Sequence, residues 1–381
     1  MSHPLPLRAA RINLRSMPEL QRAVAAMFAV GFDGKTVTPA LARLLDRGVS
    51  AVALFSRNVE SPQQVARLCF EIQQRAGRPI LIAVDQEGGR VARLREGFTR
   101  LPSMRALGAS GDEDLAEKIG RVIAAELRAV NISMNFSPVM DVDSNPANPV
   151  IGDRSFGADA ALVAKMGVAL LRGLQAGGVA ACAKHFPGHG DTSKDSHFDL
   201  PKLGHEMARL ERVELPPFAS AIEAGVAAIM TAHVIFEAID SENPATLSGG
   251  VISGLLRTKM KFPGVIFSDA LEMKAIADHF PIEQTVVKAA NAGIDLLAIC
   301  ENPDLQNRAI DALASAAAAG TVGQVVIKNA NRRVERVIRQ FVRPASEQAD
   351  LSALNSAEHR AIVERVAAMP IGVDPTERRS I

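Results

Sequence analysis

The sequence predicts an α/β fold in which parallel strands close into a barrel that forms one domain. Short apolar segments alternate with amphipathic helical segments along the chain, which is the pattern of a parallel sheet covered by helices. About eight candidate strands over roughly 330 residues favour a closed barrel over an open sheet. No GxGxxG sequence follows the first candidate strand, and this argues against a dinucleotide-binding sheet.

The candidate strands are short apolar runs, which are typical of strands buried on both faces. SAVALF at 50–55 and PILIAV at 79–84 are two examples. The double glycine in QEGG, at 86–89, predicts a turn directly after the second example. In chain order the predicted strands lie at residues 26–32, 50–55, 79–84, 133–137, 179–184, 227–232, 264–268 and 295–299.

The helices between these strands are predicted from apolar residues at helical spacing and from end signals. The pair Ser61-Pro62 supplies an N-cap and a first helical residue, and Gly48 follows the end of another helix. The predicted helices lie at residues 18–28, 38–47, 61–76, 113–130, 160–176, 210–224, 252–259, 282–291, 312–319 and 325–341.

Three segments are expected along the chain. Residues 1–16 form a loose N-terminal arm, and residues 17–343 form the barrel as a single catalytic domain. Barrels of about 250 residues or more are single domains, so the length does not require two. The composition changes at 344–381, which we expect to be a short, partly helical C-terminal appendage with one helix at 356–368.

The composition excludes several classes of protein. The 381 residues carry a net charge of +1 without a basic block, so nucleic-acid binding has no electrostatic support. No apolar run approaches the roughly 20 residues that cross a bilayer, and the first residues lack the apolar core of a signal peptide. The three cysteines, Cys69, Cys182 and Cys300, are far apart in the sequence. These features predict a reduced, cytoplasmic protein that does not bind membranes.

Ionisable residues gather after the predicted strands, where a parallel barrel carries its catalytic groups. The densest group is KHFPGHGDTSKDSHFDLP at 184–201, with three histidines, three aspartates and two lysines around a Pro-Gly-x-Gly turn. Other strand ends are followed by further polar residues: Asp85, Arg93, Asp141, Asp143, Arg154, His233, Asp269, Glu272 and Glu301. The sequence therefore predicts a site at this end of the barrel.

Four of these segments resemble motifs of the family 3 glycoside hydrolases. They are DQEGGRVARLR, NPVIGDRSFG, KHFPGHGDTSKDSHFDLP and FSDALEM, and they occur in the order found in that family. The chain is most similar to the bacterial β-N-acetylhexosaminidase branch, from about residue 20 to about residue 340. Four separated motifs are more specific than any one alone. The resemblance implies a (β/α)8 TIM-type barrel, which agrees with the number of candidate strands.

The resemblance also implies a retaining mechanism with a covalent glycosyl-enzyme. Asp269 matches the family's nucleophile, although an aspartate here could also cap a helix that begins at Ala270. Asp195 and His197 match the Asp-x-His dyad of the hexosaminidase branch. His197 would protonate the leaving oxygen and then activate water, while Asp195 would orient the ring and stabilise its cationic form.

The remaining site residues follow from the same resemblance. Asp85 matches the carboxylate that holds hydroxyls of the non-reducing sugar. Cations suit the oxygens of a sugar, and a lysine beside a carboxylate helps to keep it ionised. Four further residues match substrate-binding positions of the family: Arg93, Arg154, Lys184 and His185.

The expected function is that of a cofactor-free, metal-free retaining exo-β-N-acetylglucosaminidase. The family resemblance implies that it removes N-acetylglucosamine from muropeptide-like peptidoglycan fragments during cell-wall recycling, as a monomer or weak homodimer. A β-glucosidase is the alternative within the family. Phosphorolysis is another, because neutral His197 would not repel an incoming phosphate.

Two readings of a different class remain open from the residues alone. One is a sugar-binding protein without catalysis on the same fold, which would be expected to lack Asp269 or the dyad. The other is a metal-dependent hydrolase, for which one segment offers several potential ligands: His185, His189, Asp191, Asp195 and His197.

Overall fold

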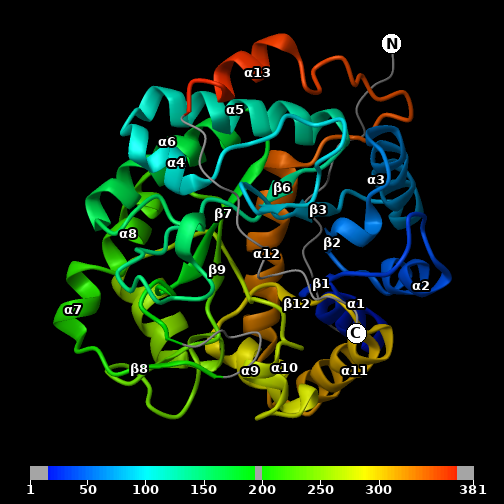
Figure 1. Cartoon of the computed structure of the whole chain (residues 1–381). Helices are drawn as coiled ribbons and strands as arrows, with labels where there is room; N and C mark the ends of the chain where they lie inside the picture. Colours follow the sequence, from blue (N-terminus) through cyan, green and yellow to red (C-terminus); the bar gives the residue numbers. More distant parts are fainter. Residues whose placement is uncertain (1–15, 194–199, 367–381) are drawn as a thin grey trace.

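A closed ring of eight parallel strands forms the centre of the computed structural model, which describes residues 16–193 and 200–366. The strands follow the order β11-β9-β7-β6-β3-β2-β1-β12, and a parallel bridge between Phe267 and Leu296 joins the two ends of this order. The predicted (β/α)8 barrel is confirmed (Figure 1). Its strands are β1 Phe28–Val30, β2 Ala51–Leu54, β3 Leu81–Val84, β6 Met134–Asn135, β7 Ala180–Phe186, β9 Ala228–Thr231, β11 Val265–Phe267 and β12 Leu297–Ile299.

Helices surround the ring, and short strands extend some of the loops (Figure 1). The helices are α1 Met17–Ala25, α2 Pro39–Arg47, α3 Pro62–Ala76, α4 Met104–Ser110, α5 Glu113–Ala129, α6 Ala160–Ala176, α7 Met207–Arg212, α8 Leu215–Glu223, α9 Lys274–Ala277, α10 Ile282–Ala292, α11 Pro303–Ala318, α12 Gln324–Phe341 and α13 Ala357–Val363. Two short strand pairs are β4 Gln86–Gly88 with β5 Val91–Ala92 and β8 Lys202–Leu203 with β10 Ile235–Phe236. No described helix combines the length and the apolar character needed to span a membrane.

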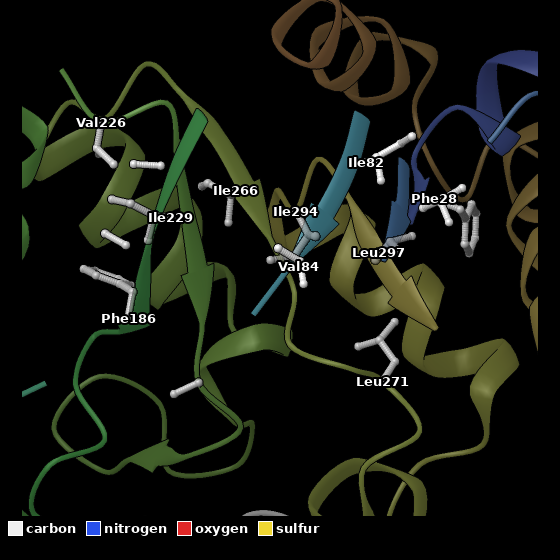
Figure 2. Close-up of a cluster of buried hydrophobic side chains, with 14 of the residues drawn as sticks. Phe28, Ile82, Val84, Phe186, Val226, Ile229, Ile266, Leu271, Ile294 and Leu297 are labelled. Carbon is white, nitrogen blue, oxygen red and sulfur yellow. The ribbon is translucent and has the colours of Figure 1, made fainter. Parts of the chain in front are cut away.

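Alternate residues of the strands point into the ring and outward against the helices, and both sets are buried. In β3, Leu81 and Ala83 belong to the inner apolar cluster, whereas Ile82 and Val84 belong to the outer one. Figure 2 shows Ile82 and Val84 among the buried hydrophobic side chains, together with Ile229 of β9. Burial on both faces explains why these strands appear in the sequence as continuous apolar runs.

The last long helix, α12, crosses the amino-terminal end of the ring (Figure 1). Its Val337 and Phe341 side chains belong to the inner cluster. Arg333 forms an ion pair of 2.9 Å with Asp295, which precedes β12. The Arg336 guanidinium donates to the carbonyl oxygen of Pro263, which precedes β11. The apolar face of α12 thus covers the lower end of the barrel.

Two predicted helices differ in the structure, and the packing of the C-terminal helix was not predicted. The helix predicted at 210–224 is two helices, α7 and α8, and the second begins at Leu215 immediately before two prolines, which have no backbone N–H. The segment predicted as a helix at 252–259 is a π-helix, Gly250–Lys259. Near the end of the described chain, α13 packs on α5, and His359 Nδ1 lies 2.9 Å from the buried Glu126 carboxylate.

Candidate active site

A cavity at the carboxyl ends of the barrel strands brings six of the eight predicted site residues together: Asp85, Arg93, Arg154, Lys184, His185 and Asp269. The other two, Asp195 and His197, lie outside the described residues. Apolar side chains complete the wall, among them Phe55, Phe136, Met230 and Phe267. The cavity therefore offers charged groups together with apolar contact surface, as a sugar ring requires for its hydroxyls and its C–H faces.

Buried carboxylates and cations alternate on the side of the cavity formed by β3 and β7. Lys184, in β7, places Nζ 2.7 Å from Asp85 Oδ1 and 2.6 Å from Glu87 Oε1. Arg93 lies 3.2 Å from the other oxygen of Asp85. The Arg154 guanidinium donates two hydrogen bonds, of 2.9 and 2.8 Å, to the two oxygens of Glu87. This fork geometry fixes both groups.

The opposite charges of this network keep one another ionised although burial disfavours the charged forms. Burial alone would raise the pKa of Asp85, but Lys184 and Arg93 outweigh it and hold that pKa well below its usual range. Burial likewise opposes ionisation of Glu87, yet Arg154 and Lys184 lower its pKa to about 2. Burial would lower the pKa of Lys184, but the two carboxylates raise it instead. All of these groups stay ionised at neutral pH.

Asp85 is the member of the network that a ligand can reach. Its side chain is 17% exposed, whereas those of Lys184 and Arg93 are 3% and 1% exposed. Asp85 follows β3 directly, so its carboxylate stands at the strand end with two cations behind it. A carboxylate held in this way can accept hydrogen bonds from two neighbouring hydroxyls without moving.

His185 is oriented by a buried aspartate. Asp141 accepts the backbone N–H groups of His185 and His189 and lies 2.7 Å from His185 Nδ1. This contact holds the His185 ring in one orientation in the cavity wall. Burial lowers the pKa of His189 to about 4, so that ring is neutral, and its Nδ1 lies 2.7 Å from Thr192 Oγ1.

Asp269 stands on the opposite side of the ring. It follows β11, and four places along the strand order separate β11 from β3. Its Oδ1 accepts the N–H of Ala270 at 2.8 Å, and the carbonyl of Ala270 lies 2.9 Å from Nε2 of the buried His233. The next helix, α9, begins only at Lys274. The alternative that Asp269 caps a helix starting at Ala270 is therefore wrong.

Residues 194–199, which include Asp195 and His197, lie between two stretches of chain whose side chains contact each other. Asp191 Oδ2 lies 2.5 Å from His205 Nε2, and Arg209 lies 3.4 Å from the same oxygen. These contacts connect the residues before and after 194–199. His189, two residues before Asp191, lines the cavity.

Several acidic and histidine residues of the cavity and its support were not predicted as site residues, among them Glu87, Asp141, His189, Glu272 and Glu301. Glu87 lies in the predicted turn at 86–89, but residues 86–88 are strand β4 of a hairpin that points Glu87 at Arg154. Gly88 has a φ of +112°, and a Cβ there would lie 2.3 Å from the carbonyl oxygen of Pro102. Apart from its place in the motif DQEGGRVARLR, the sequence signal for Glu87 is an acidic residue three positions after a buried strand.

A family model for the glycosyl hydrolase family 3 N-terminal domain matches residues 20–337. The chain belongs to glycosyl hydrolase family 3. It is therefore a glycoside hydrolase by descent, as its motifs predicted, and its substrates are carbohydrates.

Relatives and solved structures agree with this family. The chain is 44% identical over 274 residues to a beta-hexosaminidase of Thiobacillus denitrificans, a match that covers 70% of this chain and 76% of the relative. It is 42% identical to a family 3 beta-N-acetylglucosaminidase of Paenibacillus sp. str. FPU-7, with a TM-score of 0.89 over 91% of this chain and 68% of that one. NagZ of Neisseria gonorrhoeae, in complex with N-trifluoroacetyl-D-glucosamine, is 33% identical with a TM-score of 0.76 over 89% and 96%.

Proposed function

We propose that the protein is a retaining exo-β-N-acetylglucosaminidase that hydrolyses terminal β-linked N-acetylglucosamine. One observation carries this proposal: Asp269 and the Asp85–Lys184 pair line a single cavity in a chain 44% identical to a beta-hexosaminidase. A nucleophile and a rigid hydroxyl-binding group on opposite sides of one cavity are what a retaining exo-glycosidase needs in its sugar subsite.

The terminal sugar binds against the charged side of the cavity in this proposal. Asp85 accepts hydrogen bonds from its hydroxyls. Arg93, Arg154, Lys184 and His185 donate to sugar oxygens or hold the groups that do. Because these side chains are already paired and buried, little reorganisation accompanies binding.

The reaction proceeds in two steps in this proposal. The Asp269 carboxylate attacks the anomeric carbon, the glycosidic C–O bond breaks, and His197 gives its proton to the leaving oxygen. Neutral His197 then takes a proton from water, whose oxygen attacks the anomeric carbon and releases Asp269. Asp195 stabilises the imidazolium that is present before the first step and that forms again in the second.

The natural substrates are muropeptide-like fragments of peptidoglycan, and the compartment is the cytoplasm, where such fragments are recycled. Similarity to NagZ of Neisseria gonorrhoeae supports this assignment. The catalytic unit comprises residues 17–343, and the protein acts as a monomer or weak homodimer. Residues 1–15 of the predicted arm and residues 367–381 of the predicted appendage lie outside the described residues. Neither a metal nor a cofactor takes part in this scheme.

A comparison of two aryl glycosides tests the proposed function. The purified protein is assayed with an aryl β-N-acetylglucosaminide and with the matching aryl β-glucoside, before and after exhaustive chelation. We expect turnover of the first substrate, far weaker turnover of the second, and no effect of chelation. Preference for the β-glucoside would overturn the acetamido specificity. Loss of activity on chelation, restored by a divalent metal, would favour a metal-dependent hydrolase.

A further inference from the structure

Glu272 lies in the wall of the same cavity, three residues after Asp269. Its Oε1 accepts the backbone N–H groups of Cys300 and Glu301, the second at 2.9 Å. Both of these residues follow β12 and also line the cavity. The carboxyl group is therefore fixed by one oxygen to the end of the neighbouring strand.

The other oxygen of Glu272 has no partner within the described part of the chain. Oε2 is buried and accepts no hydrogen bond there, and Glu272 forms no ion pair with a described residue. Buried carboxylate oxygens are normally satisfied, so a single unsatisfied one in a cavity wall needs an explanation. Burial raises the pKa of Glu272 to about 7, and the charge of Glu301 adds to this effect.

Glu87 shows what a purely structural carboxylate looks like in this protein. Its side chain is 1% exposed and meets Arg154 and Lys184, so both oxygens are occupied. Glu272 lines the same cavity as Asp269 and Glu301, and Cys300, whose backbone N–H it accepts, is a buried free thiol. A hydrogen-bond donor that enters the cavity would supply what the surrounding residues do not.

We propose that Glu272 is a specificity-determining residue of this site, whose Oε2 accepts a hydrogen bond from a hydroxyl or the amide N–H of the sugar bound between Asp85 and Asp269. The proposal rests on the function proposed above. It gives the sugar acceptors on both sides, because β11 and β3 lie on opposite sides of the ring. It also explains why Oε1 is tied to two backbone amides, since this fixes the direction of Oε2.

The test uses Glu272→Gln in the full-length protein. The Gln carbonyl oxygen can still accept the N–H groups of Cys300 and Glu301, while an NH2 group replaces Oε2. The substrates are an aryl β-N-acetylglucosaminide and analogues that lack one donor at a time, with a hydroxyl replaced by hydrogen or the amide by an ester. We expect kcat/KM for the parent substrate to fall about tenfold to a hundredfold, the range for a hydrogen bond to a charged group.

The analogue series separates a contact with the sugar from a structural role. For the one analogue that lacks the donor bound by Glu272, we expect the variant and the wild type to have nearly equal kcat/KM, because the interaction is already absent. Glu335→Gln, on the exposed side of α12, is the matched control and should leave every value unchanged. Glu272→Ala, examined with the same series, serves as the second variant if the Gln protein does not fold.

An unchanged kcat/KM for Glu272→Gln would overturn the inference. An equal loss on the parent and on every analogue would also overturn it, because that pattern indicates a structural role. A wild-type protein without turnover of any aryl β-N-acetylglucosaminide would overturn the proposed function as well. An active wild type with an unaffected variant overturns this inference alone.

Discussion

The two sides of the cavity treat their carboxylates in opposite ways. On the side of β3 and β7, Asp85 and Glu87 meet Lys184, Arg93 and Arg154 at hydrogen-bond distance, and their pKa values are lowered. On the side of β11 and β12, Glu272 is held by backbone amides alone among the described residues, and its pKa is raised to about 7. Both sides are buried, so the difference comes from the partners.

This difference separates a fixed binding surface from a reactive one. Paired carboxylates keep their charge and position whatever enters the cavity, which suits recognition of sugar hydroxyls. A nucleophilic carboxylate must instead form and break a covalent bond with the anomeric carbon. The predictions below test this division, from the largest expected effect to the smallest.

Removal of the nucleophile should have the largest effect. For Asp269→Ala we expect kcat to fall on the order of 10⁴-fold or more, because no other group can form the glycosyl-enzyme. Steady-state assays with an aryl β-N-acetylglucosaminide measure this loss. Asp278→Asn, an exposed aspartate that pairs with Lys274, is the control and should keep full activity. Comparable activity of Asp269→Ala would assign the chemistry elsewhere.

Replacement of His197 should lower the activity by an amount that depends on the leaving group. For His197→Ala we expect a loss on the order of 10²- to 10⁴-fold with natural-type leaving groups, which need protonation. The loss should be much smaller with activated aryl glycosides, because these leave as anions. A plot of kcat/KM against leaving-group pKa tests this, and an equal loss across the series would contradict the acid assignment.

Lys184 should contribute more to the stability of the protein than a lysine in an exposed ion pair does. Lys184→Met leaves Asp85 and Glu87 buried without their shared cation, and we expect it to lower the free energy of unfolding by about 3–5 kcal/mol. Lys118→Met breaks an exposed pair with Asp114 and should cost less than about 1 kcal/mol. Urea unfolding measures both. Similar values for the two variants would show that the buried network contributes no more than a surface pair.

Much of the fold could be predicted because the strands are buried on both faces. Runs such as PILIAV leave a signal that needs no knowledge of the neighbouring strands. The position of α12 across the barrel end could not be predicted, because its apolar face would suit an outer helix equally well. The break between α7 and α8 was missed although the prolines at 216 and 217 indicate it.

The site, too, has residues that could be predicted from the sequence and residues that could not. Residues at strand ends, such as Asp85 and Asp269, could be placed on one cavity because parallel strands end at one side of a barrel. The ion-pair partners of these residues could not be predicted. Glu87 and Arg154, for example, are 67 positions apart, and Glu87 lies in a hairpin where the sequence predicts only a turn. The importance of Glu272 depends on one oxygen that has no partner among residues 16–193 and 200–366, which only the three-dimensional structure reveals.

The two sides should also differ in how their stability changes with pH, and these changes should have opposite signs. The pKa of Glu87 falls from 4.5 to about 2 on folding, so its contribution is complete above pH 4.5 and is lost as the pH falls toward 2. The pKa of Glu272 rises from 4.5 to about 7, so its contribution is complete below pH 4.5 and is lost as the pH rises toward 7.

Replacement of each glutamate by its neutral isostere tests these signs. At pH 8, Glu87→Gln should lower the free energy of unfolding by about 3–5 kcal/mol, whereas Glu272→Gln should raise it by about 1–3 kcal/mol. The gain from Glu272→Gln should fade between pH 7 and 4.5, since the protonated glutamate and glutamine are then alike. Urea unfolding at pH 8 and pH 5 measures both. A loss of stability at pH 8 in both variants would mean that Glu272 is satisfied in the folded protein, and the contrast between the two sides would not hold.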